Sequence, residues 1–75
     1  MSTFAARGEI TLSVNGSEMR VPANLTAAGL IEHMALTGKR VALERNGEIL
    51  PRSRFPEQTL EHGDQLEIVV AVGGG

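Results

Sequence analysis

QLEIVVAV, residues 65–72, is the longest strand signal in the chain and decides how the rest of it can fold. Alternate residues on one face of this segment are all apolar: Leu66, Ile68, Val70 and Val72. The opposite face is half apolar, because Val69 and Ala71 follow Gln65 and Glu67 there. A strand that is apolar on both faces usually lies inside its sheet. We therefore expect residues 65–72 to form the central strand of a sheet.

Two hairpins precede this strand, and each is marked by an Asn-Gly pair, at residues 15–16 and 46–47. A type I′ turn needs positive φ at both central positions, which asparagine and glycine adopt most readily. Each return strand is closed by a proline, Pro22 or Pro51, which has no N–H to donate. The predicted strands of the hairpins are residues 9–14, 18–21, 41–45 and 48–50.

One amphipathic helix is predicted between the hairpins, over residues 26–36. Its apolar residues recur with helical spacing: Ala27, Leu30, Ile31, Met34 and Ala35. Residues 24–26 offer N-caps, and Gly38 is the expected C-cap. Gly29 inside the helix costs about 1 kcal/mol relative to alanine, which a close approach to the sheet would offset. The element order indicates an α+β fold of the β-grasp type, a mixed sheet of four to five strands covered by one helix.

Composition excludes several classes of function. A chain of 75 residues supports one small core, and the absence of cysteine excludes disulfides and thiolate metal sites. A net charge of −2 and only two aromatic residues argue against nucleic-acid or anionic-membrane partners. No apolar run approaches the roughly 20 residues of a membrane-spanning helix, and the first residues lack the pattern of a secretory signal. We expect a soluble, cytoplasmic domain over residues 9–72, preceded by a disordered extension over residues 1–8.

The domain contains no recognisable catalytic or metal-binding motif. His33 and His62 have no third ligand at metal-site spacing, so His33 is interpreted as a flank of the helix and His62 as a turn residue. No serine has a nucleophile-elbow context, and no phosphate-binding loop occurs. We predict that the chain is not an enzyme and holds no metal.

The loop after the second hairpin contains a small basic concentration, in which Arg52 and Arg54 flank a serine. These residues either keep the loop soluble or steer an acidic partner. Phe55 is expected to anchor the loop in the core.

The sequence ends in Gly73-Gly74-Gly75. Without Cβ atoms such a tail is thin enough to enter a narrow channel backbone-first, and three extended residues reach about 10 Å. It is either a frayed terminus or a carboxylate offered to another protein as an acyl substrate.

These features together resemble the ThiS family of sulfur carriers in thiamin biosynthesis, which are ubiquitin-like β-grasp proteins. The resemblance covers about residues 9–75 and rests on NGEILPRS at 46–53, GDQLEIV at 63–69 and AVGGG at 71–75. Two features depart from the family pattern: the extension over residues 1–8, and Ala27-Ala28-Gly29 where the carriers more often have acidic residues.

The resemblance implies that Gly75 is the chemical group of the protein. An E1-like adenylating enzyme of the ThiF type would use ATP and Mg to convert the carboxylate to an acyl-adenylate. A cysteine-desulfurase relay would supply sulfur, and the resulting thiocarboxylate would donate it to a thiazole synthase of the ThiG type. Gly73 and Gly74 would thread the partner's active site, and this chain itself would bind no cofactor.

Two partners would then recognise one small domain. The candidate docking residues on the open face of the sheet are Glu67, Val69 and Ala71. Arg52 and Arg54 form a second candidate group. The alternative is that the strand is apolar on both faces only because it is central. Other functions also remain open: the small sulfur-carrier subunit of molybdopterin synthase, a ubiquitin-like protein modifier, or a structural interaction module.

Overall fold

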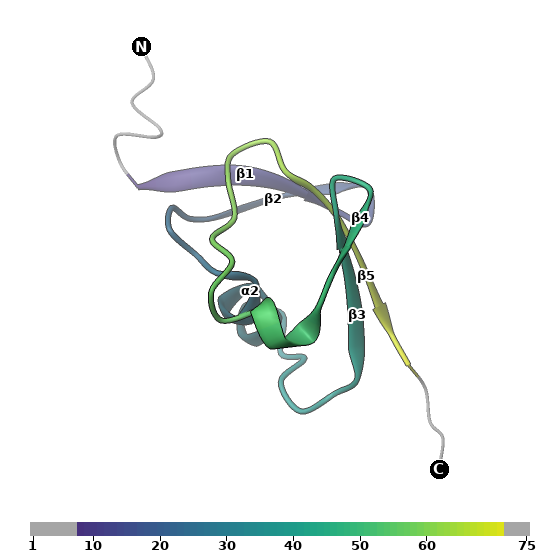
Figure 1. Cartoon of the computed structure of the whole chain (residues 1–75). Coiled ribbons are helices and arrows are strands. Elements are labelled where there is room, and N and C mark those ends of the chain that lie inside the picture. Colours follow the sequence, from purple (N-terminus) through teal and green to yellow (C-terminus); the bar gives the residue numbers. More distant parts are fainter. Residues whose placement is uncertain (1–7, 72–75) are drawn as a thin grey trace.

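Residues 8–71 are described by the computed structural model, and they form a five-stranded mixed sheet with one α-helix across one face (Figure 1). The strands are β1 (Glu9–Val14), β2 (Ser17–Pro22), β3 (Val41–Arg45), β4 (Glu48–Leu50) and β5 (Gln65–Val70). The α-helix is α2 (Ala27–His33), and a 3₁₀ turn, η1 (Arg52–Arg54), lies in the loop after β4. The predicted extension and the glycine tail lie outside the described residues, except for Gly8, whose carbonyl accepts a hydrogen bond from Ala23.

The sheet order is β2-β1-β5-β3-β4, which confirms that β5 is central. β5 runs parallel to β1 and antiparallel to β3, while each hairpin supplies an antiparallel pair. The predicted α+β architecture of the β-grasp type is therefore confirmed, with five strands and one covering helix.

β5 is shorter than predicted, because it ends at Val70 and not at Val72. Val70 is paired with Val41, the first residue of β3, so the ladder has no further partner residue in that strand. One further backbone bond follows within the described residues, from the Ala71 N–H to the Arg40 carbonyl at 2.9 Å. Val70 is already 36% exposed, so the buried face of β5 is confined to Leu66 and Ile68.

Both Asn-Gly turns have the predicted backbone conformation. The φ angles are 51° and 85° at Asn15 and Gly16, and 52° and 85° at Asn46 and Gly47. Positive values at both central positions are those of type I′ turns.

The start of α2 is fixed by its cap and by the loop that follows β4. Thr26 is the N-cap, and its hydroxyl accepts a hydrogen bond from the Gly29 N–H at 3.1 Å. Two further free N–H groups of the first turn, those of Ala27 and Ala28, donate to the carbonyls of Gln58 and Phe55. The loop is therefore bonded to the helix start, and Phe55 is buried as predicted.

The predicted end of the helix was wrong. α2 ends at His33, and Ala35 has a left-handed φ of 60°. The Ala35 and Leu36 N–H groups donate to the Glu32 and Ile31 carbonyls, which is the bond pattern of a Schellman motif. Alanine thus holds the position that glycine usually takes, and Gly38, the predicted C-cap, lies in the turn beyond.

The reason proposed for Gly29 was also wrong. A Cβ built at Gly29 would lie 2.7 Å from Leu25 Cδ1 and 3.4 Å from the Thr26 hydroxyl oxygen, and no strand atom is among its nearest neighbours. The close approach is therefore to the residues that precede the helix and not to the sheet.

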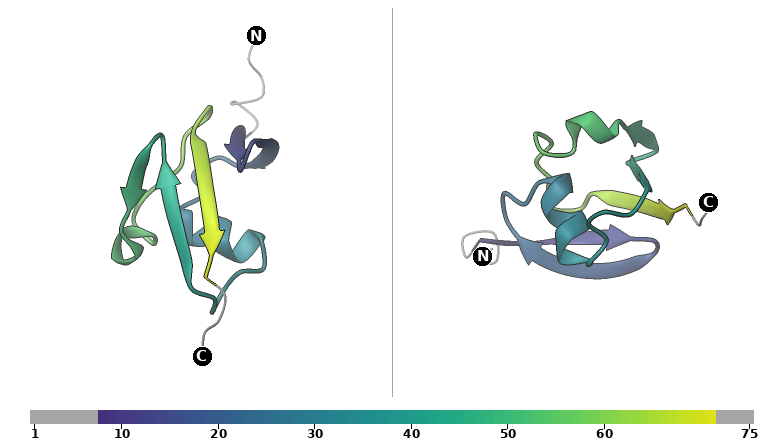
Figure 2. Two further views of the ribbon diagram at one scale, coloured as in Figure 1. Left: turned by 90° about the vertical axis from the view of Figure 1, so that its right-hand side faces the viewer. Right: turned by 90° about the horizontal axis from the view of Figure 1, so that it is seen from below.

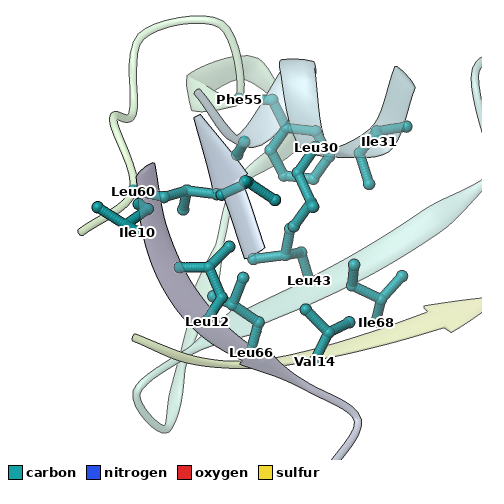
Figure 3. Packing of buried hydrophobic residues seen from close by; sticks show 12 residues of the cluster. Ile10, Leu12, Val14, Leu30, Ile31, Leu43, Phe55, Leu60, Leu66 and Ile68 are labelled. Carbon is teal, nitrogen blue, oxygen red and sulfur yellow. The ribbon is translucent and has the colours of Figure 1, made fainter. Parts of the chain in front are cut away.

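The core lies between the helix and one face of the sheet (Figure 3). It is filled by aliphatic side chains and Phe55, and its most completely buried large residues are Leu12, Leu30, Leu43, Leu60 and Leu66. In the left view of Figure 2 the helix lies behind the sheet, and the face toward the viewer carries no covering element.

Candidate functional site: the open face of the sheet

The strand register places alternate residues of all five strands on the uncovered face, which we call the open face. On the two central strands Ala42 is opposite Val69, and Glu44 is opposite Glu67. Glu44 is also opposite Ile49 of the edge strand β4. The remaining residues of the open face lie on strands β1 and β2 and at the start of β5: Glu9, Thr11, Ser13, Glu18, Arg20, Pro22 and Gln65.

The open face contains exposed apolar side chains near the C-terminal end of β5. Val69 is 63% exposed and Ile49 is 67% exposed, and Ala42 lies beside Val69 in the register. We call Ala42, Ile49 and Val69 the apolar patch. Ile49 lies one row away from the Ala42–Val69 pair, opposite Glu44. Exposed aliphatic side chains on an otherwise polar face are typical of contact surfaces.

The predicted docking residues on β5 are all exposed, since Glu67 and Val69 lie on the open face and Ala71 follows directly after the strand. Sequence reasoning missed Ile49 and Ala42. The alternation of residues in the short strand β4 indicates that Ile49 and its neighbours lie on opposite faces. Only the pairing of β4 with β3 shows that Ile49 is on the open face.

Acidic residues lie beside the apolar patch. Glu44 and Glu67 line an open hollow of about 390 Å³, which ends at the glycines of the two hairpin turns, Gly16 and Gly47. Among residues 8–71 neither glutamate side chain has a hydrogen bond or an ion pair.

The start of β5 is held by a buried carboxylate that sequence reasoning did not identify. Asp64 accepts hydrogen bonds from Arg45 Nε at 2.8 Å, from the Glu61 N–H at 2.9 Å and from Asn46 Nδ2 at 3.0 Å. Asn46 Oδ1 in turn accepts the N–H of Gln65. The first residues of β5 are therefore tied to the turn between β3 and β4.

The pKa of Asp64 results from two opposing effects. Burial of the carboxyl group raises its pKa, but hydrogen bonds from Arg45, the Glu61 amide and Asn46, together with the charge of Arg45, outweigh burial and hold the pKa below its ordinary value. Asp64 is thus ionised and fully bonded, which makes it a structural group.

The basic loop does not join the open face. Arg52 lines a separate hollow of about 230 Å³ beside α2, together with Ala28 and Ile31. Arg54 lies on the same 3₁₀ turn, with its Nε 3.8 Å from a carboxylate oxygen of Glu57. The two predicted groups of docking residues therefore belong to different sides of the molecule.

Within residues 8–71 neither histidine makes a hydrogen bond or ion pair with another titratable side chain, although His62 lines a hollow that Glu18 also lines. His62 Nδ1 accepts the Thr11 N–H at 3.1 Å, and His33 is exposed at the last position of α2. Within residues 8–71, no three histidine, aspartate or glutamate side chains gather as metal ligands. No helix in this part of the chain has the length and apolarity needed to cross a membrane.

Comparisons with known proteins agree on one family. The ThiS family matches residues 4–75. The chain is 37% identical over 65 residues to the sulfur carrier protein ThiS of Bacillus subtilis, covering 85% of this chain and 98% of that protein. The crystal structure of the thiamine biosynthesis protein ThiS from Geobacter metallireducens is similar with a TM-score of 0.73 and 33% identity, covering 88% of this chain and 100% of that one.

A further similarity is to a longer protein. The chain is 39% identical over 64 residues to a thiazole synthase of Paramagnetospirillum magneticum, a match that covers 85% of this chain. The matched segment is 20% of that synthase, so the chain spans about a fifth of the length of this relative.

Proposed function

The chain belongs to the ThiS family, the sulfur carriers of thiamin biosynthesis, and on this premise we propose that it carries sulfur as a thiocarboxylate on Gly75. The observation that supports the proposal is where the sheet stops. Within residues 8–71 the final backbone bond beyond β5 is from Ala71 to Arg40, and the segment that contains the three glycines follows in the sequence. The strand thus gives the tail a fixed base close to the apolar patch.

The proposed chemistry begins with activation, because a free carboxylate would have to expel oxide. In the active site of an E1-like enzyme of the ThiF type, a Gly75 carboxylate oxygen attacks the α-phosphorus of Mg-bound ATP and pyrophosphate leaves. A persulfide from a cysteine-desulfurase relay then attacks the acyl carbon, and AMP departs with the bonding electrons of the broken C–O bond. A thiol cleaves the resulting S–S bond, so the relay is oxidised to a disulfide and the sulfur stays on Gly75 as a thiocarboxylate.

This chain is a small carrier protein in that scheme, and every catalytic group belongs to a partner. Gly73 and Gly74 pass through the partner's channel, where a Cβ would collide with the walls. The absence of cysteine suits the role, since no thiol of the carrier competes for the transferred sulfur.

Thiazole synthase of the ThiG type is the proposed acceptor of the sulfur. The similarity of this chain to one segment of thiazole synthases supports this assignment, because those proteins contain a segment similar to this carrier chain. The open face, with Glu67, Val69 and Ala71, is proposed as the common docking surface, and Arg52 and Arg54 as a separate contact for an acidic region.

The function is tested by the mass of the protein isolated from its own cells. Replacement of a carboxylate oxygen by sulfur adds about 16 Da, close to the mass of one methionine oxidation, so fragmentation must place the added mass on Gly75. A thiocarboxylate on Gly75 is the expected result. A carboxylate in every molecule, including those from cells starved of thiamin, would contradict the proposal, and amide-linked adducts would indicate a protein modifier.

The docking surface is tested by replacing Val69 with aspartate. Val69→Asp is expected to slow adenylation of the chain while its circular dichroism spectrum is unchanged, because Val69 is exposed in the free domain. Unchanged adenylation kinetics would exclude this part of the open face.

A further inference from the structure

Two glutamates of the open face oppose each other without a compensating cation. Glu44 and Glu67 are direct partners in the β3–β5 register, so their Cβ atoms are about 5 Å apart. Like charges in directly opposed positions destabilise a sheet. Among residues 8–71 neither carboxylate has an ion-pair partner, so the free domain retains this repulsion.

The charge of the whole described domain is concentrated on this face. The open face carries four glutamates and one arginine, and the arginine, Arg20, lies 4.0 Å from Glu9 at the far hairpin. Elsewhere among residues 8–71 cationic and anionic side chains are equal in number. The net negative charge of residues 8–71 therefore lies on the open face, and the rest of their surface is neutral.

Apolar side chains flank the glutamate pair. Ile49 is the next residue in the same row, opposite Glu44, and Val69 is two residues beyond Glu67 on β5. Both are more than 60% exposed. A partner that covers them removes water from the two carboxylates, which strengthens any charge interaction made there.

We propose that Glu44 and Glu67 together receive one arginine side chain of the adenylating partner, within an interface whose apolar contacts are Ile49 and Val69. A guanidinium presents several N–H donors in one plane and can bind two neighbouring carboxylates, which a compact ammonium does less well. Glu44 and Glu67 belong to adjacent strands whose backbones are about 4.8 Å apart, so one guanidinium can reach both carboxylates. The inference rests on the proposed function, because it assigns the chemistry of the same partner.

A second copy of this chain is a poor occupant of the face. It would bring the same four glutamates into contact, and juxtaposed like charges oppose association. The charge of the face therefore favours a different, cationic protein.

Glu44 and Glu67 are unfavourable in the free domain and favourable in the complex. Their replacement should therefore raise the stability of the domain and lower its affinity for the partner. Glu44→Gln and Glu67→Gln should each raise the melting temperature by about 2–4 °C, since they remove the repulsion. The same substitutions should raise the KM for the chain in ATP–pyrophosphate exchange by the adenylating enzyme about tenfold, with kcat unchanged. A residue with only a structural role would not change stability and affinity in opposite directions.

The matched control is Glu48→Gln. Glu48 neighbours Ile49 on β4, is exposed, and faces away from the open face, since it is paired with Arg45 in the register. We expect this variant to keep the wild-type KM. Raising the salt concentration should raise the KM of the wild type and of Glu48→Gln more steeply than that of Glu67→Gln.

The outcomes separate this inference from the proposed function. If the wild-type chain supports exchange and both glutamine variants keep its KM, the arginine contact is refuted and the carrier function stands. If the wild-type chain supports no exchange with the enzyme from its own cells, the carrier function fails and the inference fails with it. A dimer of the free chain that Glu67→Gln strengthens would assign the face to a second copy and overturn the proposal.

Discussion

The side-chain amide of Asn15 makes two hydrogen bonds to the backbone of Ile68, one as an acceptor and one as a donor. Asn15 Oδ1 accepts the Ile68 N–H at 2.8 Å, and Asn15 Nδ2 donates to the Ile68 carbonyl at 3.1 Å. The parallel pairing of β1 with β5 ends at Val14 and Leu66. Asn15 therefore extends the pairing of β1 with β5 through its side chain, beyond the point where the β1 backbone turns away. Asn15 is also the first central residue of the type I′ turn.

Asn15→Gly should destabilise the domain by about 2 kcal/mol. Glycine keeps the positive φ, so the substitution isolates the loss of two hydrogen bonds to β5, each contributing about 1 kcal/mol. The free energy of unfolding in urea gives the result. Asn24→Gly is the matched control, because Asn24 also has a positive φ of 70° but no side-chain hydrogen bond within the described chain. Equal stability of the two variants would show that the Asn15 side chain contributes nothing.

Asp64 should make the domain sensitive to acid. Its pKa is lowered in the folded state, so its contribution is fully present above the unfolded value of about 3.9 and is lost as pH falls through the lower, folded value. We expect Asp64→Asn to cost about 3 kcal/mol near pH 7, because charge-assisted bonds are lost. The difference between wild type and variant should stay constant down to about pH 5 and shrink below pH 4.

Urea unfolding at several pH values measures this difference. Glu57→Gln is the control, since Glu57 is an exposed carboxylate with a long surface contact to Arg54. A stability difference between wild type and Asp64→Asn that does not change between pH 7 and pH 3 would mean that ionisation of Asp64 is irrelevant to the fold.

Ala35→Gly should stabilise the domain by about 1 kcal/mol. A left-handed φ at a residue with a Cβ costs about 1–2 kcal/mol, and part of this gain is offset by the greater freedom of glycine in the unfolded chain. Ala28→Gly, inside α2, should change the stability by a similar amount with the opposite sign. Thermal unfolding of the two variants checks both signs, and a lower melting temperature for Ala35→Gly would contradict the prediction.

Gly74→Val should leave the fold intact and abolish transfer. The substitution lies beyond Ala71, the last described residue, which is bonded to Arg40, so the melting temperature should not change. Adenylation should fall at least about 100-fold in kcat/KM, because a displaced carboxylate loses its alignment with ATP. Ser53→Val, at an exposed position of η1, introduces the same side chain elsewhere and should keep the wild-type rate. Wild-type activity of Gly74→Val would remove the threading role of the tail.

The hairpins were predictable because their information is local. An Asn-Gly pair between alternating apolar residues specifies a type I′ turn, and both turns formed at the expected residues. The central position of β5 was also predictable, since apolar residues on both faces indicate a strand with two neighbours.

The errors arose where a distant or unusual residue decides the structure. β5 stops early because its partner β3 begins at Val41. The sequence of β5 by itself holds no information about where β3 begins. The helix ends at His33 because Ala35 takes a conformation usually reserved for glycine. Asp64 is buried because Arg45, nineteen positions away, is brought beside it by the sheet. Residue type alone gave no sign of that pairing.

The sheet order has a mechanical consequence. The two hairpins do not pair with each other in the described domain, and only β5 joins them, through β1 on one side and β3 on the other. A force applied at Ala71 along the axis of β5 would load hydrogen bonds that lie across this axis on both sides. Such a force shears two ladders at once and does not peel one strand from an edge. The fold would therefore resist the load that the proposed entry of the tail into a partner's channel places on β5.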